Sequence, residues 1–246
     1  DTGREVLDRI HAINAGERAW ADCSQDMSIA ITDTRGNEKT RVIVMYVKKY
    51  PEDARRSTVF FRDPADVKGM GFLQWSYPHG EDQQWLYLPA LKRVRQISGG
   101  SKTDSFAGSN LSYEDLAIIS QILDWSDADA SISVVGKESI DGGDATVIDM
   151  TPTGKKVAYG KVRIWIRSSD LVMVRLELFS STLTPLKRVS LGEVKLIGSI
   201  PTPHTVEVTD LTGSSHTKIT ISNIRYDQKL GDEAFSQRVL ERGTIQ

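Results

Sequence analysis

The acidic stretch Asp124–Asp129 holds three aspartates within six residues and is a candidate group of metal ligands. Read as a calcium loop that begins at Asp127, it would place Glu138 at position twelve, where such loops carry a bidentate glutamate. The same loop needs glycine at position six for its sharp turn, and this chain has Ile132 there. We therefore predict no metal site in this stretch.

Other spacings that would support catalysis or phosphate binding are incomplete. The segment Gly99–Thr103 ends in Ser-Lys-Thr, so it lacks the glycine that precedes lysine in a P-loop. The four histidines have no metal-ligand spacing, no Gly-x-Ser-x-Gly elbow is present, and the single Cys23 lies outside any thiol motif. We predict a non-enzyme with no catalytic residue, metal or cofactor. A lipid hydrolase is the disfavoured alternative, because its nucleophile motif is missing.

The charge totals describe a nearly neutral chain. Lys and Arg number 31 and Asp and Glu number 33, which gives 31 − 33 = −2. That balance gives no electrostatic reason to expect nucleic acid or an anionic membrane surface as a partner. No apolar run approaches the roughly 20 residues that span a bilayer. One thiol cannot form an internal disulfide, so cysteine usage does not decide the redox compartment.

The elements that would position any site are two helices and many strands. The capping-box pattern Thr2–Glu5 begins the first helix and Gly16 ends it. Ser112 is the N-cap of the second helix. The side of this helix that we expect to be buried carries Leu116, Ile119, Ile122 and Leu123.

Alternating and β-branched segments predict roughly ten strands around these helices. Turn residues separate the segments, as at Asp63-Pro64 and Asp141–Asp144. A sheet of this size should curl around whatever covers its concave face, and the two amphipathic helices are the available cover. With 246 residues the chain could hold one large β domain or two small ones. Because composition shows no break, we predict a single domain over residues 1–246.

Two aromatic segments, Gly71–Tyr77 and Gln83–Leu88, flank a loop of turn-forming residues. If they pair about that loop, Trp75 lies opposite Trp85 and Leu73 lies opposite Tyr87. Strand parity then places Leu73, Trp75, Trp85 and Tyr87 on one face. This wall either packs beneath a helix as ordinary core or faces a ligand, and the sequence leaves both interpretations open.

The segment from Ser98 to Gly108 is rich in glycine and serine and reads as a flexible loop. It follows a locally basic stretch with Lys92, Arg93 and Arg95. One hypothesis makes this loop a gate that moves as a ligand enters, and the alternative is a passive surface connection. The residues that would form the gate are Gly99, Gly100, Phe106 and Gly108.

Five stretches together resemble the outer-membrane lipoprotein-sorting protein family, which is similar to LolA. The first reads Phe-Arg-Asp-Pro-Ala-Asp-Val-Lys-Gly-Met-Gly-Phe-Leu from Phe61 to Leu73. The others run from Gln84 to Ile97, from Gly100 to Leu116, from Ile200 to Thr202 and from Asp232 to Arg242. The resemblance covers nearly the whole chain and is densest between Phe61 and Leu116.

The resemblance implies an α+β, mainly β fold: a half-open antiparallel β-barrel of about eleven strands wrapped around lid or plug helices. It also implies a periplasmic, monomeric carrier that holds acyl chains of a lipid or lipoprotein in a hydrophobic cavity, for transport toward the outer membrane. We expect the cavity wall to include Leu73, Trp75, Trp85, Tyr87, Leu116 and Ile119.

Members of this family often accompany inner-membrane transporters of the resistance-nodulation-division (RND) type, which implies a partner of that type. The alternative function is therefore an accessory module that docks such a transporter and has a filled core. The chain begins at Asp1 without Met. We expect that a signal peptide was removed on export, although a trimmed recombinant chain would begin in the same way.

Overall fold

The computed structural model of the chain describes residues 1–245. It divides into two compact units. Unit 1 comprises Asp1–Ala19 and Leu123–Lys218, and unit 2 comprises Trp20–Ile122 and residues 219–245. Each unit combines chain segments that are distant in sequence, and the single domain stays a prediction.

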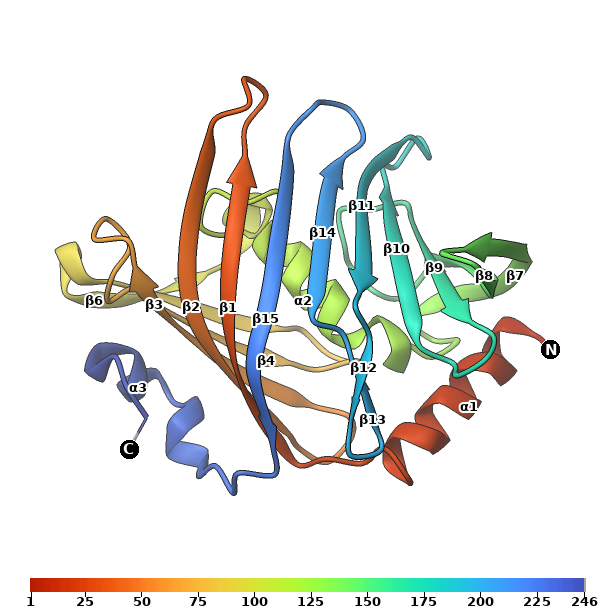
Figure 1. Cartoon of the computed structure of the whole chain (residues 1–246), viewed down its shortest axis with the longest axis horizontal. Coiled ribbons are helices and arrows are strands. Elements are labelled where there is room, and N and C mark those ends of the chain that lie inside the picture. The colour runs from red at the N-terminus through yellow and green to blue at the C-terminus, as the bar shows by residue number, and fades with distance from the viewer. Residues whose placement is uncertain (246) are drawn as a thin grey trace. The chain divides into compact units, whose positions relative to one another are not determined.

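Unit 1 contains one α-helix and most of the second half of the chain (Figure 1). Its elements are α1 (Gly3–Ala15), β7 (Ala130–Ile140), β8 (Gly143–Pro152), β9 (Lys161–Arg167), β10 (Met173–Phe179), β11 (Pro185–Gly192), β12 (Lys195–Ile197), β13 (Ile200–Thr202) and β14 (Thr205–Asp210). Ile148, Ile164 and Leu176 are fully buried on one face of this sheet. The α1 helix lies against β7, and it approaches so closely that a Cβ on Gly3 would meet the Ile132 side chain at 2.8 Å.

Unit 2 contains the first six strands and two α-helices (Figure 1). Its elements are β1 (Asp22–Thr32), β2 (Glu38–Lys49), β3 (Arg55–Asp63), β4 (Gly71–Ser76), β5 (Gln83–Leu88), η1 (Pro89–Leu91), β6 (Arg93–Ile97), η2 (Gly99–Thr103), α2 (Tyr113–Gln121), η4 (Asp232–Phe235) and α3 (Gln237–Arg242), where η marks a 3-10 helix. The boundary between the units falls within β15 (His216–Tyr226) and η3 (Ile122–Asp124).

The hydrogen-bonded strand order is β6-β5-β4-β3-β2-β1-β15-β14-β11-β10-β9-β8-β7, and β12 pairs with β13 in a separate hairpin. The sheet is antiparallel and is not closed into a barrel, which confirms the predicted mainly β, half-open fold class. Within residues 1–245 the sheet has thirteen strands, against the eleven or so that we expected. Strands β6 and β7 stand at the two ends of this order, so each keeps one unpaired edge.

Both predicted helix starts are confirmed. The Thr2 hydroxyl accepts from the Glu5 N–H while the Glu5 side chain accepts from the Thr2 N–H, as in a capping box. Ser112 and Asp115 form the same reciprocal pair at the start of α2. Within residues 1–245, no helix has the length and apolarity needed to cross a bilayer.

The register between β4 and β5 corrects one prediction. Leu73 pairs with Trp85, and Trp75 pairs with Gln83, so the strands are offset by two residues from the expected pairing. The Tyr77 N–H donates to the Asp82 carboxylate at 2.9 Å, within the loop that joins the two strands. A shift of two residues preserves the faces of the side chains. The wall residues therefore still share a face, and the rings of Trp75 and Trp85 lie 5.0 Å apart, centroid to centroid.

The C-terminal segment is a structural element that the sequence pattern did not reveal. Residues 232–242, quoted above only for a family resemblance, form η4, which contacts β3, and α3, which contacts β4, β5 and β6 of the same unit. The apolar positions Ala234, Phe235, Val239 and Leu240 are all buried. With only six residues, α3 is too short for a periodic pattern to be recognised in the sequence.

Candidate functional site

The sheet of unit 2 has two faces with different covers. On one face, Val59 of β3 pairs with Phe72 of β4, which pairs with Leu86 of β5. We call it the helix face, because α2 lies against it. On the other face, Thr58 pairs with Leu73, which pairs with Trp85. We call this the C-terminal face, because η4 and α3 cover it.

All four residues of the predicted aromatic wall lie on the C-terminal face. They pack with Phe60 against the buried residues Ala234, Phe235, Val239 and Leu240. The indole N–H of Trp75 donates to the Phe235 carbonyl at 2.9 Å, and the Thr58 hydroxyl donates to the Ala234 carbonyl at 2.8 Å. The wall is therefore covered by the chain's own C-terminal segment, as core.

A charged clasp fastens the start of that segment. The Lys48 ammonium donates to the Leu230 carbonyl and to the Asp232 carboxylate, each at 2.8 Å. The Tyr50 hydroxyl donates to the same Asp232 oxygen at 2.7 Å. Hydrogen bonds from Lys48 and then from Tyr50 hold the pKa of Asp232 below its ordinary value. The carboxylate is thus ionised at neutral pH and ties the segment to β2.

A row of neutral polar side chains fastens α2 to the helix face. The Gln84 amide donates to the Gln74 side chain at 2.8 Å and to the Tyr113 carbonyl at 2.7 Å, and all these groups are buried. The Gln74 amide donates to the Ser120 hydroxyl at 3.1 Å. Buried amides satisfied in this way fix one position of the helix on the sheet. We call Gln74, Gln84, Ser76 and Ser120 the polar seam.

Aromatic side chains seat the loop that precedes α2. Phe106 is 5% exposed and lies 5.7 Å from Phe61, 5.5 Å from Phe72 and 6.0 Å from Tyr113, centroid to centroid. Such tilted and edge-on pairs add to the apolar burial. Of the proposed gate residues, Phe106 is therefore the anchor of the loop in the core of unit 2.

The glycines of the proposed gate lie at turns of the same loop. Gly99 and Gly100 begin η2, and Gly99 and Gly108 have φ values of +56° and +78°, in the region that favours glycine. A Cβ added to Gly99, Gly100 or Gly108 would meet no atom within 4 Å. These three positions thus border open space, whereas the Phe106 side chain is buried among aromatic neighbours.

The helix residues of the predicted cavity, Leu116 and Ile119, lie on α2 and are half-buried. The structure does not bring them to the aromatic wall, because α2 contacts one face of the sheet and the wall forms the other. Strand parity assigns residues to a common face, but it does not say which face a given helix covers. The predicted single lining is thus divided between the two faces of the sheet.

Other half-buried apolar residues lie on the helix face and were missed. Met45 pairs with Val59 and Val47 pairs with Ser57, which places Met45 and Val47 on this face of β2. Met27, opposite Ile43 on β1, continues the same row. The run from Val42 to Val47 is apolar at every position, so its sequence alone gives no sign of which side chains share a face.

A hollow of about 450 Å³ opens elsewhere on unit 2, between the turns at Tyr50–Arg56 and Tyr77–Glu81. Its lining mixes Arg55 and Arg56 with Glu52 and Glu81, so it favours neither sign of charge. The Arg56 guanidinium is already stacked on the rings of Tyr50 and Trp75, at 4.5 and 4.1 Å from their centroids.

Cys23, the single thiol, is 5% exposed on β1. Burial first, and the neighbouring Asp22 carboxylate second, raise the pKa of Cys23 to about 12. A thiol with this pKa is protonated at neutral pH and is a poor nucleophile.

Comparisons with known proteins place this fold. A family model with the description "Uncharacterized protein" matches residues 53–242, and the search among curated proteins finds no match. A solved domain of Vibrio parahaemolyticus, named for outer membrane lipoprotein sorting, is 27% identical with a TM-score of 0.87, over 98% of this chain and 100% of that one.

Two further structures agree along nearly the full length. A DUF1329 family protein of Desulfovibrio piger is 30% identical with a TM-score of 0.87, over 97% of both chains. A LolA superfamily protein of Nitrosomonas europaea is 18% identical with a TM-score of 0.72, over 97% of this chain and 99% of that one, which shows a shared fold. The chain therefore belongs to the DUF1329 family and has the fold of the LolA superfamily.

Proposed function

We propose that this protein is a non-enzymatic carrier of the periplasm that shelters the acyl chains of a lipid or lipoprotein on their way to the outer membrane. The observation that carries the proposal is the similarity, over 98% of the chain, to a domain named for outer membrane lipoprotein sorting. A single carrier domain that acts as a monomer is part of the proposal.

The energetics of carriage set the kind of site that is needed. Each methylene that leaves water contributes about 0.8 kcal/mol, so a chain of about 16 carbons involves on the order of 12 kcal/mol. A membrane offers nearly the same gain at either end of the journey. A carrier must bind the acyl chain with a free energy close to that of the bilayer, so that it can still release the lipid. This favours an apolar lining without strong hydrogen bonds or ion pairs to the ligand.

We place the acyl chains against the helix face rather than against the aromatic wall. The wall packs against Phe235 and its neighbours, and this includes its half-buried members Trp75 and Tyr87. Met45, Val47, Leu116 and Ile119 are half-buried on the α2 side of the sheet, outside that cluster. Methionine adapts to irregular apolar partners because its side chain is unbranched and polarisable. These residues replace Leu73, Trp75, Trp85 and Tyr87 as the proposed contacts.

The test is binding of a fluorescent fatty acid to the delipidated protein, with a matched pair of variants on β2. Met45→Gln should weaken binding about tenfold, because a polar amide would face the hydrocarbon. Val44→Gln, one residue away, points to the C-terminal face and should leave the affinity unchanged. The proposal would be wrong if the wild-type protein showed no saturable binding of the fatty acid, or if both variants lost the same amount of affinity.

The proposed gate would open by withdrawing Phe106 from its aromatic neighbours, while Gly99, Gly100 and Gly108 supply the turns that move. A passive connection would keep Phe106 in place throughout. Uptake kinetics of a Phe106 variant, described in the Discussion, separate the two.

The alternative function is an accessory module that docks an RND-type transporter. It is favoured by one observation, namely that the aromatic wall is filled by the chain's own segment. Native mass spectrometry of protein purified from its own cell envelope discriminates between the two. Co-purifying lipid supports the carrier, whereas lipid-free protein bound to a transporter supports the module.

A further inference from the structure

One segment of unit 2 carries a concentrated positive charge that the overall balance conceals. Residues 83–103 contain Lys92, Arg93, Arg95 and Lys102 and no aspartate or glutamate, so they carry a net charge of +4 in a chain with a net charge of −2. The nearly neutral total, taken above as a reason not to expect an anionic membrane surface, therefore does not describe this segment.

The tip of the segment is a turn that holds a leucine out in solvent. The 3-10 turn Pro89–Leu91 is closed by a hydrogen bond from the Lys92 N–H to the Pro89 carbonyl at 3.1 Å. Leu91 is 56% exposed, among the most exposed large apolar side chains of the described residues. Pro89 also lies against Gly69 of the neighbouring turn, where an added Cβ would meet the Pro89 ring at 3.3 Å. The turn is thus held by local contacts, and the Leu91 side chain remains mostly exposed.

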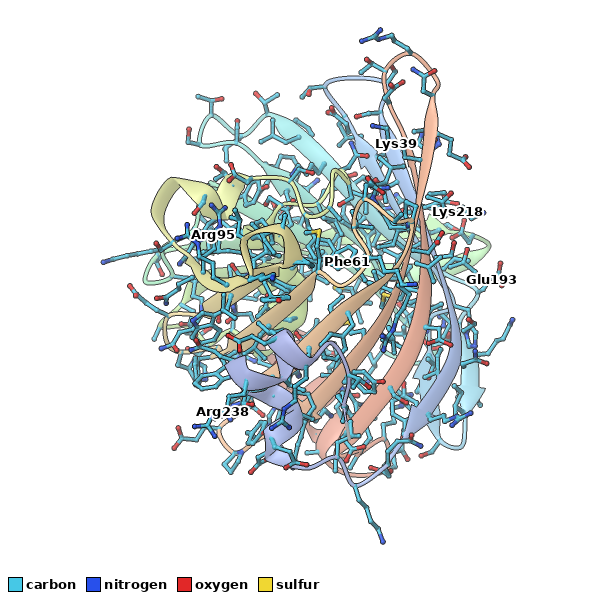
Figure 2. The ribbon with its side chains drawn as sticks, turned by 90° about the vertical axis from the view of Figure 1, so that its left-hand side faces the viewer. Lys39, Phe61, Arg95, Glu193, Lys218 and Arg238 are labelled. Atoms are coloured by element: carbon cyan, nitrogen blue, oxygen red, sulfur yellow. The ribbon has the colours of Figure 1, made fainter. Side chains whose placement is uncertain are left out.

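Three cations follow this leucine closely in the sequence. Lys92 directly follows Leu91, and Arg93 and Arg95 lie on β6, the end strand of the sheet order. The side chains of all three cations are exposed. Figure 2 shows Arg95 on the yellow outer segment, away from the central Phe61. Among residues 1–245, none of these three cations forms an ion pair with a carboxylate. We call Leu91, Lys92, Arg93 and Arg95 the basic tip.

We propose that the basic tip docks the protein on an anionic lipid bilayer. Near such a surface each Lys or Arg contributes about 1 kcal/mol, which is about fivefold in binding, and a leucine adds apolar insertion between the headgroups. The cations alone would be enough to bind an acidic protein. The exposed leucine instead fits a lipid surface, which has an apolar layer beneath its charged headgroups. The inference deepens the proposed carrier function, since a carrier must reach a membrane to exchange its load.

The experiment is sedimentation of the full chain with vesicles of phosphatidylglycerol and phosphatidylcholine in equal parts, against vesicles of phosphatidylcholine alone. The triple variant Lys92→Gln, Arg93→Gln, Arg95→Gln should lose about 100-fold in partition to the anionic vesicles. Leu91→Ser should lose about tenfold. The control, Lys39→Gln, Lys195→Gln, Lys218→Gln, removes the same charge from other exposed positions and should bind like wild type.

Added salt supplies a second measurement on the unmodified protein, because screening should weaken the wild type steeply and the triple variant little. The proposal is overturned if the wild-type protein does not bind anionic vesicles. It is also overturned if the control variant loses as much vesicle binding as the triple variant. So does binding to native membranes that protease treatment abolishes, since the partner would then be a protein. Fatty-acid binding by the triple variant in solution is measured separately, so a failure of docking is distinguishable from a failure of carriage.

Discussion

The two faces of the unit 2 sheet both carry aromatic residues but hold their covers in different ways. On the C-terminal face, Trp75 and Trp85 pack against Phe235 in one cluster, and the Lys48–Asp232 clasp fastens the start of the C-terminal segment. On the helix face, Phe106 seats the loop and the neutral polar seam holds α2. The first arrangement is mainly apolar packing, with single hydrogen bonds from Trp75 and Thr58 to the covering segment, and the second combines aromatic packing with a row of amides and hydroxyls.

The comparison separates stability from function within one sheet. A closed apolar cluster maximises the area removed from water and leaves no room for a ligand. A polar seam fixes a helix in one place but leaves the neighbouring apolar residues Met45, Leu116 and Ile119 only half-buried. We therefore expect substitutions on the C-terminal face to act on folding, and substitutions on the helix face to act on ligand binding as well.

The largest expected effect is at Phe235. Phe235→Ala removes a fully buried ring and should lower the free energy of unfolding by about 4 kcal/mol, measured by urea denaturation. Fatty-acid affinity per folded molecule should not change, because Phe235 lies on the face away from α2. A variant of normal stability that no longer binds fatty acid would show that the C-terminal face takes part in ligand binding.

The next effect is at Phe106. Phe106→Ala should cost about 3 kcal/mol, at the low end for a buried phenylalanine because a surface loop can relax. If the loop is a gate, stopped-flow uptake of the fluorescent fatty acid should become faster in this variant. Uptake at the wild-type rate, with the stability loss confirmed by denaturation, would show a passive connection.

A smaller effect is expected in the polar seam. Gln84→Ala deprives the buried Tyr113 carbonyl and the Gln74 side chain of their donor, at a cost of about 2 kcal/mol. Hydrogen exchange should accelerate in α2 and remain unchanged in α3. Equal acceleration in both helices would mean that the two covers are not independent.

The smallest effect concerns the clasp. Because the folded pKa of Asp232 is lowered, its contribution is complete above the ordinary aspartate pKa and is lost as the pH falls through the lowered value. Asp232→Asn should cost less than about 1 kcal/mol, since the carboxylate is exposed and screened. Protection of residues 234–240 from hydrogen exchange, corrected for the pH dependence of the intrinsic exchange rate, should fall on acidification in the wild type but not in Asp232→Asn. An acid response that survives in the variant would assign it to another group.

Local signals in the sequence determined the helix starts, the strands and the shared face of the aromatic wall. Thr2 and Ser112 cap their helices through side chains a few residues away, and strand parity is a property of the backbone. The absence of a recognisable catalytic motif and the family resemblance were also readable from the residues.

Tertiary structure alone decided what each face meets. The sequence did not fix the pairing of Leu73 with Trp85, and the cover over the wall came from a segment about 150 residues later in the chain. Parity divides side chains into two sets, but the choice of cover for each set is a competition among all apolar segments of the chain, and that competition is resolved only when they pack together.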